Sequence, residues 1–232
     1  MKQFEKVKAA KENSPPIKGI IFDLDGTLYK MHWIIRPWMT IKAFPNIFRL
    51  PRFLKERSRY AGLDLNCKND LMNKLCSSLS VIEKCQPEEI QKWIDTVFYP
   101  SFVSSMIFFK NSRPGVNATL EKLKDSGIKL GVLSDYDLVA ERLQKLGIDT
   151  SLFETLTSSE FYGALKPSPR PLLAVAELWN LKPENVLIVG DRDDTDGAAA
   201  KAAGMQFQKI CDKGEDLNSW SALQQYFSNL CR

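Results

Sequence analysis

Two carboxylates separated by one residue, Asp23 and Asp25, lie at the end of the short apolar segment 18–24. If the chain continues as a regular strand, residues i and i+2 point to the same side of it. Two like charges this close repel each other, so a cation should lie nearby and allow both groups to ionise. Gly26 permits the sharp turn that leaves the strand. An ordinary strand followed by an Asp-Gly turn explains the same residues, so the motif alone leaves both interpretations open.

Polar residues that could take part in catalysis or ligand binding recur where further apolar segments end. The segments 128–134 and 185–190 finish at Ser134 and just before Asp191. Lys166 supplies a cation between them. In a parallel sheet, ligands bind at the carboxyl ends of the strands, so we expect these side chains to converge there.

The elements that must position these residues follow from the hydrophobic pattern. The apolar segments are too short for helices and are typical of buried parallel strands, with a weaker strand near 153–158. Apolar residues at helical spacing predict helices over 116–127, 139–147, 168–179 and 195–203. The alternation predicts an α/β fold, a Rossmann-like parallel sheet with helices on both faces.

Residues 31–109 break this alternation and contain three stretches of helical character, at 35–60, 68–80 and 87–99. They predict an inserted, mostly α-helical domain, whose apolar end, 97–109, packs its helices and the return to the core. The predicted organisation is a mobile tail (1–17), an α/β core (18–30 and 110–232) and the insert (31–109).

Composition excludes several classes of protein. The chain has 232 residues, 44% hydrophobic and 26% charged, which is typical of a globular protein. It has no apolar run of 18 residues and no apolar signal sequence near its start, which predicts neither a transmembrane helix nor secretion. Its five cysteines form no C-x-x-C pair, so we expect free thiols in a reducing, cytoplasmic location. The single histidine, His32, does not favour a zinc site.

The order of the polar motifs is more specific than any one of them. Asp-x-Asp, Ser134, Lys166-Pro and Gly-Asp191 follow one another with spacing that resembles the haloacid dehalogenase-like superfamily. The resemblance covers roughly 18–30 and 110–210. It implies that the insert is a helical cap that closes over the active site and excludes water.

The resemblance also implies a role for each motif in phosphoryl transfer. Asp23 would attack phosphorus and form an aspartyl-phosphate, and Asp25 would serve as general acid and then general base. Ser134 and Lys166 would bind the phosphoryl group. Mg²⁺ would lie between Asp23, the backbone carbonyl of Asp25, and Asp191.

Supporting roles fall to Thr27 and to one acid of the run after Asp191. Asp193, Asp194 and Asp196 compete for that outer role or simply complement a helix N-terminus, and Asp196 is preferred. Asp135, next to Ser134, would oppose phosphate binding unless its side chain turns away.

These roles predict a Mg²⁺-dependent phosphatase that hydrolyses a small phosphorylated metabolite. The second acid, Asp25, disfavours dehalogenation, because a halide leaves without a proton. The alternatives are a phosphotransferase or phosphomutase of the same family, and a non-catalytic docking protein that uses the basic insert.

The net positive charge of the chain is concentrated in the insert, with 13 basic and 7 acidic side chains between Lys30 and Lys110. Within residues 33–59, seven basic residues alternate with the aromatic residues Trp33, Trp38, Phe44, Phe48 and Phe53. Three explanations stay open: a lid that grips an anionic substrate, a basic surface for anionic lipid or nucleic acid, or aromatics that pack the cap beneath a solvated basic face. The last is preferred; a membrane surface and nucleic acid are less favoured partners, and His32 is interpreted as a cap-hinge residue.

Overall fold

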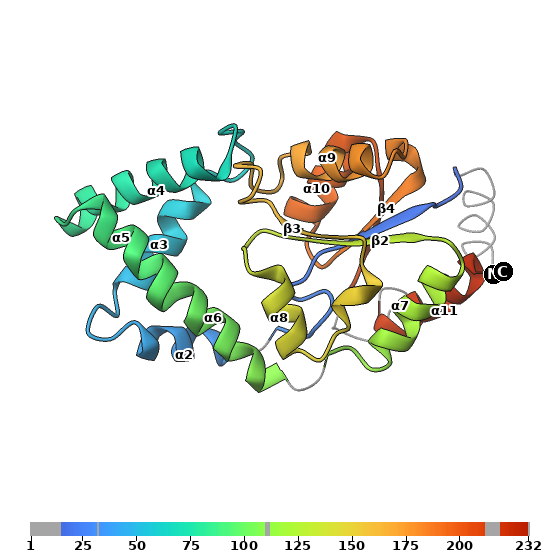
Figure 1. Ribbon diagram of the computed structural model, residues 1–232, viewed down its shortest axis with the longest axis horizontal. Helices are drawn as coiled ribbons and strands as arrows, with labels where there is room; N and C mark the ends of the chain where they lie inside the picture. The colour runs from blue at the N-terminus through green and yellow to red at the C-terminus, as the bar shows by residue number, and fades with distance from the viewer. Residues whose placement is uncertain (1–14, 32, 110–111, 212–218, 232) are drawn as a thin grey trace.

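The protein contains a five-stranded parallel sheet, seen in a computed structural model that describes residues 15–31, 33–109, 112–211 and 219–231 (Figure 1). The strand order is β3-β2-β1-β4-β5, and every neighbouring pair is parallel. The strands are β1 (Gly19–Phe22), β2 (Lys129–Ser134), β3 (Thr155–Ser158), β4 (Val186–Gly190) and β5 (Gln206–Lys209). The predicted Rossmann-like α/β fold is confirmed. The predicted tail lies outside the described residues except for residues 15–17, and so does His32.

Burial explains which strands the sequence predicts well. The central strands β1 and β4 are buried along their whole length, and β2 is buried except at Lys129. The edge strands β3 and β5 are mostly half-buried, with the sequences TLTS and QFQK. Strand β5 escaped prediction because a half-buried edge strand needs no continuous apolar run.

Helices cover both faces of the sheet, as two separate apolar clusters show. Ile20 and Phe22 belong to a cluster that includes side chains of α7 (Val116–Asp125), α8 (Val139–Lys145) and α11 (Trp220–Leu230). Ile21 points to the other face and joins α9 (Arg170–Leu178) and α10 (Ala198–Ala203). The period-2 alternation of strand side chains therefore separates the two helical layers.

The stretch between β1 and α7 forms a helical group on the left of Figure 1. Its helices are α2 (Ile35–Lys42), α3 (Arg49–Ser58), α4 (Lys68–Glu83), α5 (Pro87–Trp93) and α6 (Tyr99–Ser105), with π-helical and 3₁₀ turns η1 (Ile94–Phe98) and η2 (Met106–Phe109). The rings of Phe53, Trp93 and Phe98 pack together with centroids 4.6–5.9 Å apart. Phe102 and Met106 are also buried, so part of the apolar end of the insert packs as predicted.

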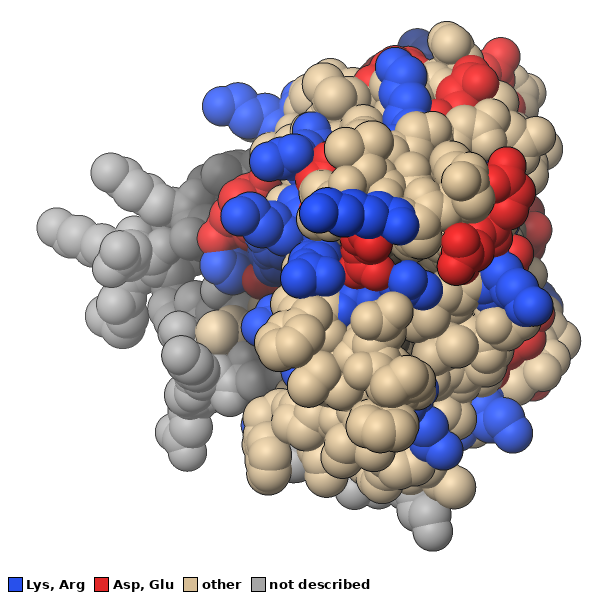
Figure 2. Space-filling model, turned by 90° about the vertical axis from the view of Figure 1, so that its left-hand side faces the viewer, with Lys and Arg blue, Asp and Glu red and all other residues tan. Residues whose placement is uncertain are grey.

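The prediction that the aromatic residues of 33–59 pack the inside of this insert is wrong for three of the five. Phe53 is buried and Trp38 is half-buried, but Trp33, Phe44 and Phe48 are exposed. Figure 2 shows the end of the molecule that carries these helices: an uncharged area covers its lower part, with Lys and Arg side chains above it and along its edge. The aromatic residues therefore divide between an inner core and an outer surface.

A buried polar network joins the helical group to the sheet. Arg57 of α3 donates through Nε to Glu160 (3.0 Å) and through Nη2 to the carbonyl of Asp135 (2.6 Å). The Tyr99 hydroxyl donates to the other oxygen of Glu160. The Arg57 guanidinium lies over the Tyr136 ring, 4.0 Å from its centroid. This network holds the segment after Ser134, so the helical group contacts the part of the core that carries the polar motifs.

A second contact lies where the chain passes from α3 to α4. Gly62 donates to the carbonyl of Leu165 (3.1 Å), and Leu65 donates to that of Gly163 (3.0 Å). Gly163 has φ +66°, and a Cβ there would lie 2.3 Å from the carbonyl oxygen of Cys67. The close approach of these two backbones therefore requires glycine at position 163.

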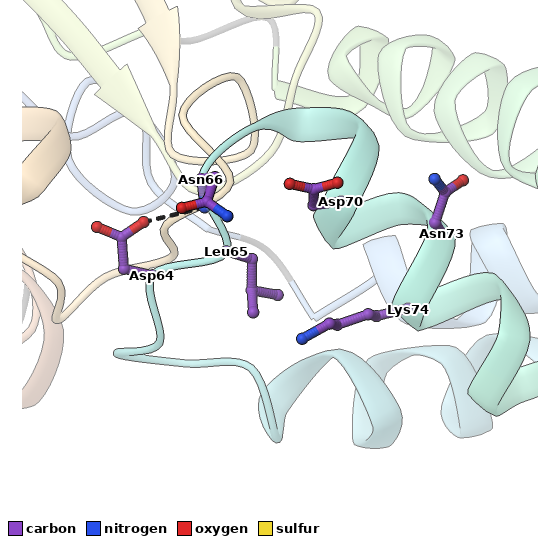
Figure 3. A pocket seen from close by; sticks show the side chains of 6 residues that line it. All are labelled: Asp64, Leu65, Asn66, Asp70, Asn73 and Lys74. Carbon is purple, nitrogen blue, oxygen red and sulfur yellow. Dashed lines mark hydrogen bonds between the residues drawn. The ribbon is translucent and has the colours of Figure 1, made fainter.

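A hollow of about 350 Å³ opens beside this crossing, between residues 64–66 and the first turns of α4 (Figure 3). Asp64 accepts a hydrogen bond from the backbone N–H of Asn66 (3.1 Å), and Asp70, Asn73 and Lys74 complete the lining with Leu65. None of the polar motif residues of the sheet lines it.

Among the described residues, no helix combines the length and the hydropathy that a membrane span requires. The five cysteines are free thiols, as predicted.

Candidate functional site

The motif residues meet at one edge of the sheet because parallel strands place their carboxyl ends together. Asp23 follows β1, Ser134 ends β2, and Asp191 follows β4. Lys166 enters from the loop between β3 and α9. These four positions belong to three neighbouring strands and one adjacent loop, although they span about 170 residues of chain.

Asp23 is held in a defined orientation at the end of β1. Lys166 Nζ lies 2.7 Å from Asp23 Oδ1, and the Thr27 hydroxyl donates to Asp23 Oδ2 at 3.0 Å. Burial raises the pKa of Asp23 well above its usual range; Lys166 opposes this, whereas the charges of Asp196 and Asp25 add to it. The site therefore disfavours an uncompensated negative charge here.

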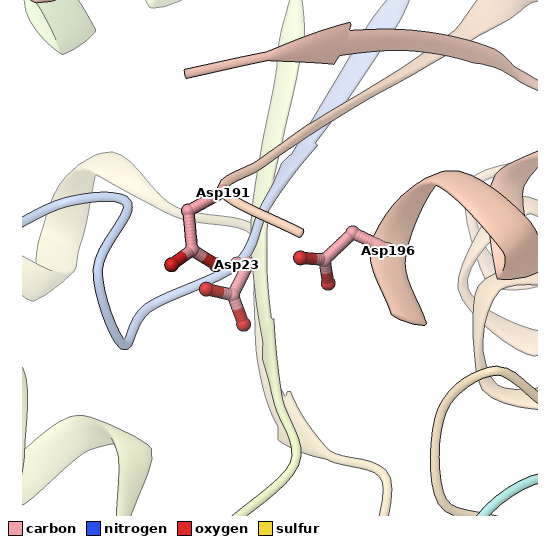
Figure 4. Close-up of side chains that lie close together, drawn as sticks. All are labelled: Asp23, Asp191 and Asp196. Atoms are coloured by element: carbon pink, nitrogen blue, oxygen red, sulfur yellow. The ribbon is translucent and has the colours of Figure 1, made fainter. Parts of the chain in front are cut away.

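The carboxylates of Asp23, Asp191 and Asp196 lie close together at this edge of the sheet (Figure 4). One oxygen from each lies within 4.8 Å of the others. Burial, with a contribution from Asp196, raises the pKa of Asp191 to about 6. A cluster of oxygen ligands whose ionised forms repel one another suits a hard divalent cation such as Mg²⁺.

The backbone after Asp23 also comes against this cluster. Gly26 has φ +95°, and a Cβ at this position would lie 2.4 Å from Asp191 Oδ2. Only glycine combines this backbone angle with such a close approach. The turn at residues 25–26 therefore lies directly beside the Asp191 carboxylate.

Asp196 occupies the outer side of the cluster. Its Oδ1 accepts from Lys166 Nζ (2.6 Å), and its Oδ2 accepts from the backbone N–H of Arg192 (3.3 Å). The other two acids of the run lie outside: Asp194 pairs with Arg192, Asp193 pairs with Lys209, and both side chains are exposed. Of these three acids, Asp196 alone faces the motif residues, and it contacts Lys166 directly.

Lys166 is a buried cation at this edge. Besides the two carboxylates, its Nζ contacts the carbonyl of Leu133 at 3.2 Å. Its backbone N–H donates to Asp135 Oδ1 (3.1 Å). Asp135 therefore turns its side chain toward the Lys166 backbone, which removes the expected conflict with an anion beside Ser134.

Asp25 lies in a different environment from Asp23. Arg142 Nη1 contacts both carboxylate oxygens of Asp25, at 2.9 and 2.7 Å, and Tyr29 donates to Oδ1 at 2.6 Å. Burial alone would raise the pKa of Asp25, but the Arg142 charge and the hydrogen bonds lower it below its usual value. This arrangement holds Asp25 as a carboxylate.

Ser134 belongs to the same hydrogen-bonded group. Its hydroxyl donates to Asp25 Oδ2 (2.9 Å) and accepts from Arg142 Nη2 (2.8 Å) and from the backbone N–H of Tyr136 (3.1 Å). A hydroxyl has one proton, so in this arrangement Ser134 directs it to Asp25. Its predicted bond to a phosphoryl oxygen requires that this proton turn toward the ligand.

Arg142 belongs to this site by its contacts with Asp25 and Ser134, and the sequence analysis did not predict it. It is fully buried in α8 and lies 117 positions from Asp25 in the chain. A signal was present: positions 139, 142 and 146 share one face of a helix, and 139 and 146 are apolar. A charged residue in an apolar stripe indicates a buried ion pair.

Comparison with known proteins agrees with this geometry. The family model for haloacid dehalogenase-like hydrolases matches residues 17–204. The chain belongs to this family. The predicted resemblance is thus confirmed, and the protein is a hydrolase by family.

Two curated relatives and one solved structure illustrate the similarity. The phosphoglycolate phosphatase of Aquifex aeolicus is 30% identical over 193 residues, 81% of this chain and 82% of the relative. The glyceraldehyde 3-phosphate phosphatase of Methanopyrus kandleri is 38% identical over 202 residues, 84% of each chain. A beta-phosphoglucomutase from Clostridium difficile superposes with a TM-score of 0.61 at 19% identity, covering 92% of this chain and 98% of its own. This last likeness concerns the fold alone.

The buried lysine makes a testable contribution to stability. Lys166→Met leaves the carboxylates of Asp23 and Asp196 buried without their counter-charge, so we expect a loss of about 3–5 kcal/mol in the free energy of unfolding. Urea denaturation of the purified chain measures it. The control is Arg192→Met, which breaks an ion pair whose side chains are 58% and 70% exposed and should cost less than about 1 kcal/mol. Equal losses in the two variants would contradict this account of the site.

Proposed function

We propose that the protein is a Mg²⁺-dependent phosphatase that hydrolyses a small phosphomonoester through an aspartyl-phosphate on Asp23. The observation that carries the proposal is the buried Asp23 carboxylate, held between Lys166 Nζ and the Asp191–Asp196 cluster. The curated relatives support it, because those reported above are named as phosphatases of small phosphorylated metabolites. Residues 31–109 then act as the cap.

The proposed reaction has two displacements at phosphorus. In the first, Asp23 forms a bond to phosphorus while the ester oxygen leaves and takes a proton from Asp25. In the second, Asp25 removes a proton from water, whose oxygen bonds to phosphorus as the Asp23–phosphorus bond breaks. Inorganic phosphate is released, and both aspartates return to their starting states.

The arrangement around Asp25 matches the second displacement directly. Arg142, Tyr29 and Ser134 all donate to its oxygens and stabilise the ionised form, which is the form that accepts a proton from water. Protonated Asp25 cannot accept all of these hydrogen bonds. The first displacement therefore requires part of this set to change when substrate binds.

The oxygen cluster fits the predicted cation. Asp23, Asp191 and the backbone at residue 25 would hold Mg²⁺, and the bound ion would neutralise charge on the transferring phosphoryl group. Lys166 places a second positive charge beside Asp23. Asp196 keeps Lys166 in position from the outer side.

The nucleophile is tested by Asp23→Asn. Purified protein with Mg²⁺ should hydrolyse p-nitrophenyl phosphate and members of a panel that includes phosphoglycolate and glyceraldehyde 3-phosphate. Asp23→Asn should reduce each rate by at least about 10³-fold, because the attacking oxygen is lost. Asp194→Asn, an exposed acid of the same acidic run, should keep the parent rate. Absence of turnover across the panel, or an active Asp23→Asn variant, would refute the proposal.

The acid role of Asp25 predicts a dependence on the leaving group. Asp25→Asn should slow the first displacement by about 10²–10⁴-fold for an alkyl phosphate, whose alkoxide must be protonated. The loss should be much smaller for p-nitrophenyl phosphate, since nitrophenolate leaves without a proton. Single-turnover kinetics of both substrates measures this step. The same loss for both would assign Asp25 to positioning rather than to proton transfer.

The raised pKa of Asp191 predicts a pH-dependent response to Mg²⁺. The folded-state pKa of about 6 exceeds the ordinary value of 3.8, so without metal this group favours folding at low pH and loses that contribution as pH rises through 6. Mg²⁺ replaces the proton above pH 6. At 100-fold excess over its Kd it should raise the melting temperature by roughly 5–10 °C at pH 7.5, and clearly less at pH 5.

Asp191→Asn provides the matched variant for that measurement. It should melt at a higher temperature than the parent chain without metal, since a repelling charge is gone, and should lose the shift with Mg²⁺. Asp194→Asn should retain the shift. A Mg²⁺ shift that persists in Asp191→Asn would remove this residue from the proposed ligand set.

A further inference from the structure

The outer end of the cap exposes large apolar side chains that the proposed reaction does not use. We define the cap patch as Trp33, Ile41, Phe44, Phe48, Ile107 and Phe108. Trp33 and Phe44 are 75% and 79% exposed, and Ile41 and Phe48 are 68% and 64% exposed. Isolated exposed hydrophobics are common, but a cluster of aromatic and aliphatic side chains at one end marks an interaction surface.

The members of the cap patch come from neighbouring elements. Ile41 lies on α2, Phe44 and Phe48 lie in the connection to α3, and Phe108 lies on η2. The half-buried ring of Trp38 joins α2 to η2, because its centroid is 4.9 Å from that of Phe108 in an edge-on contact. The uncharged area in the lower part of Figure 2 covers this end of the cap.

The cap patch is not the core-facing side of its helix. Helix α2 buries Ile35 and Met39, four residues apart, against the interior of the cap. Ile41 points away from that face and is exposed. The helix therefore carries apolar side chains on two faces, and the fold buries only one of these faces.

Basic side chains border the aromatic rings. Lys42 Nζ lies 4.7 Å from the centroid of Trp38, and the Arg52 guanidinium lies 5.9 Å from that of Phe48. Arg36 and Lys42 are exposed, and the Arg52 side chain is 47% exposed although it contacts Glu83 at 3.5 Å. An apolar centre with a cationic border matches the surface of an anionic bilayer, whose acyl boundary accepts the rings and whose headgroups attract the cations.

The composition of the cap patch separates this occupant from nucleic acid. Single-stranded nucleic acid stacks its bases on aromatic side chains, and duplexes are held by phosphate contacts. Exposed isoleucines such as Ile41 and Ile107 serve neither purpose, but they bury readily at the acyl boundary of a membrane.

We propose that the cap patch docks the protein on the surface of a bilayer rich in anionic phospholipid. Trp33, Phe44 and Phe48 insert at the headgroup boundary, and Arg36, Lys42 and Arg52 contact the lipid phosphates. The docking surface contains none of the motif residues of the sheet edge. The proposal can therefore be tested independently of the phosphatase activity.

The test is co-sedimentation of the full chain with vesicles. Vesicles of 30% phosphatidylserine in phosphatidylcholine should bind the protein at least about tenfold more tightly than pure phosphatidylcholine vesicles, and binding should weaken as salt is raised. The triple variant Trp33→Ser, Phe44→Ser, Phe48→Ser should lose at least about tenfold in affinity. Arg36→Glu with Lys42→Glu should lose the preference for phosphatidylserine.

The matched control removes exposed apolar side chains elsewhere. Phe161 and Leu178 are 62% and 69% exposed and belong to the α/β core; the double variant Phe161→Ser, Leu178→Ser should bind vesicles as the parent does. Thermal melting and hydrolysis of p-nitrophenyl phosphate should be unchanged in the triple variant, which shows that the fold and the catalytic edge are intact.

Three results would overturn the proposal. They are no binding to phosphatidylserine vesicles, an equal loss of binding in the control variant, and a concentration-dependent dimer of the parent chain that the triple variant abolishes while vesicle binding is unaffected. The last would assign the cap patch to a second copy of this chain.

Discussion

The Lys166 ammonium organises the negative charge at the carboxyl edge of the sheet. It contacts Asp23 at 2.7 Å and Asp196 at 2.6 Å in a place where all three side chains are buried. Three converging carboxylates would otherwise repel one another strongly in a region with little water. The loop after β3 must therefore deliver its lysine here, and Asp135 fixes that loop by accepting the Lys166 backbone N–H.

A second buried cation, Arg142, gives Asp25 a different environment from that of Asp23. Lys166 contacts Asp23, whose pKa is nevertheless raised by burial and by neighbouring acids, whereas Arg142 pairs with both oxygens of Asp25 and lowers its pKa. Two identical side chains two residues apart thus acquire opposite tendencies toward protons. The proposed first displacement needs the reverse, an ionised Asp23 and a protonated Asp25, so it requires a cation beside Asp23 and a change in the contacts of Asp25. The division depends on α8 packing an arginine against the end of the sheet.

The cap combines two surfaces of different chemistry. Toward the core, Arg57 and Tyr99 form buried polar contacts with Glu160 and hold the segment after Ser134. Such contacts demand specific geometry, because a buried charge that lost its partner would be costly. Away from the core, the cap patch leaves apolar side chains exposed. The same insert therefore contacts the carboxyl edge of the sheet on one side and leaves an apolar surface exposed on the other.

The fold class, and the residues that meet at the carboxyl edge of the sheet, follow from the sequence alone. Buried strands such as β1 need continuous apolar residues, and parallel strands bring residues such as Asp23 and Asp191 to one edge wherever they lie in the chain. It did not show β5, whose sequence QFQK suits a half-buried edge strand, and it misplaced Phe44 and Phe48 inside the cap. The contact of Arg142 with Asp25 across 117 residues of chain, and the orientation of Asp135 toward Lys166, depend on tertiary packing. The reason is physical: local periodicity reports whether a side chain can be buried, whereas its partner is set by how distant elements pack.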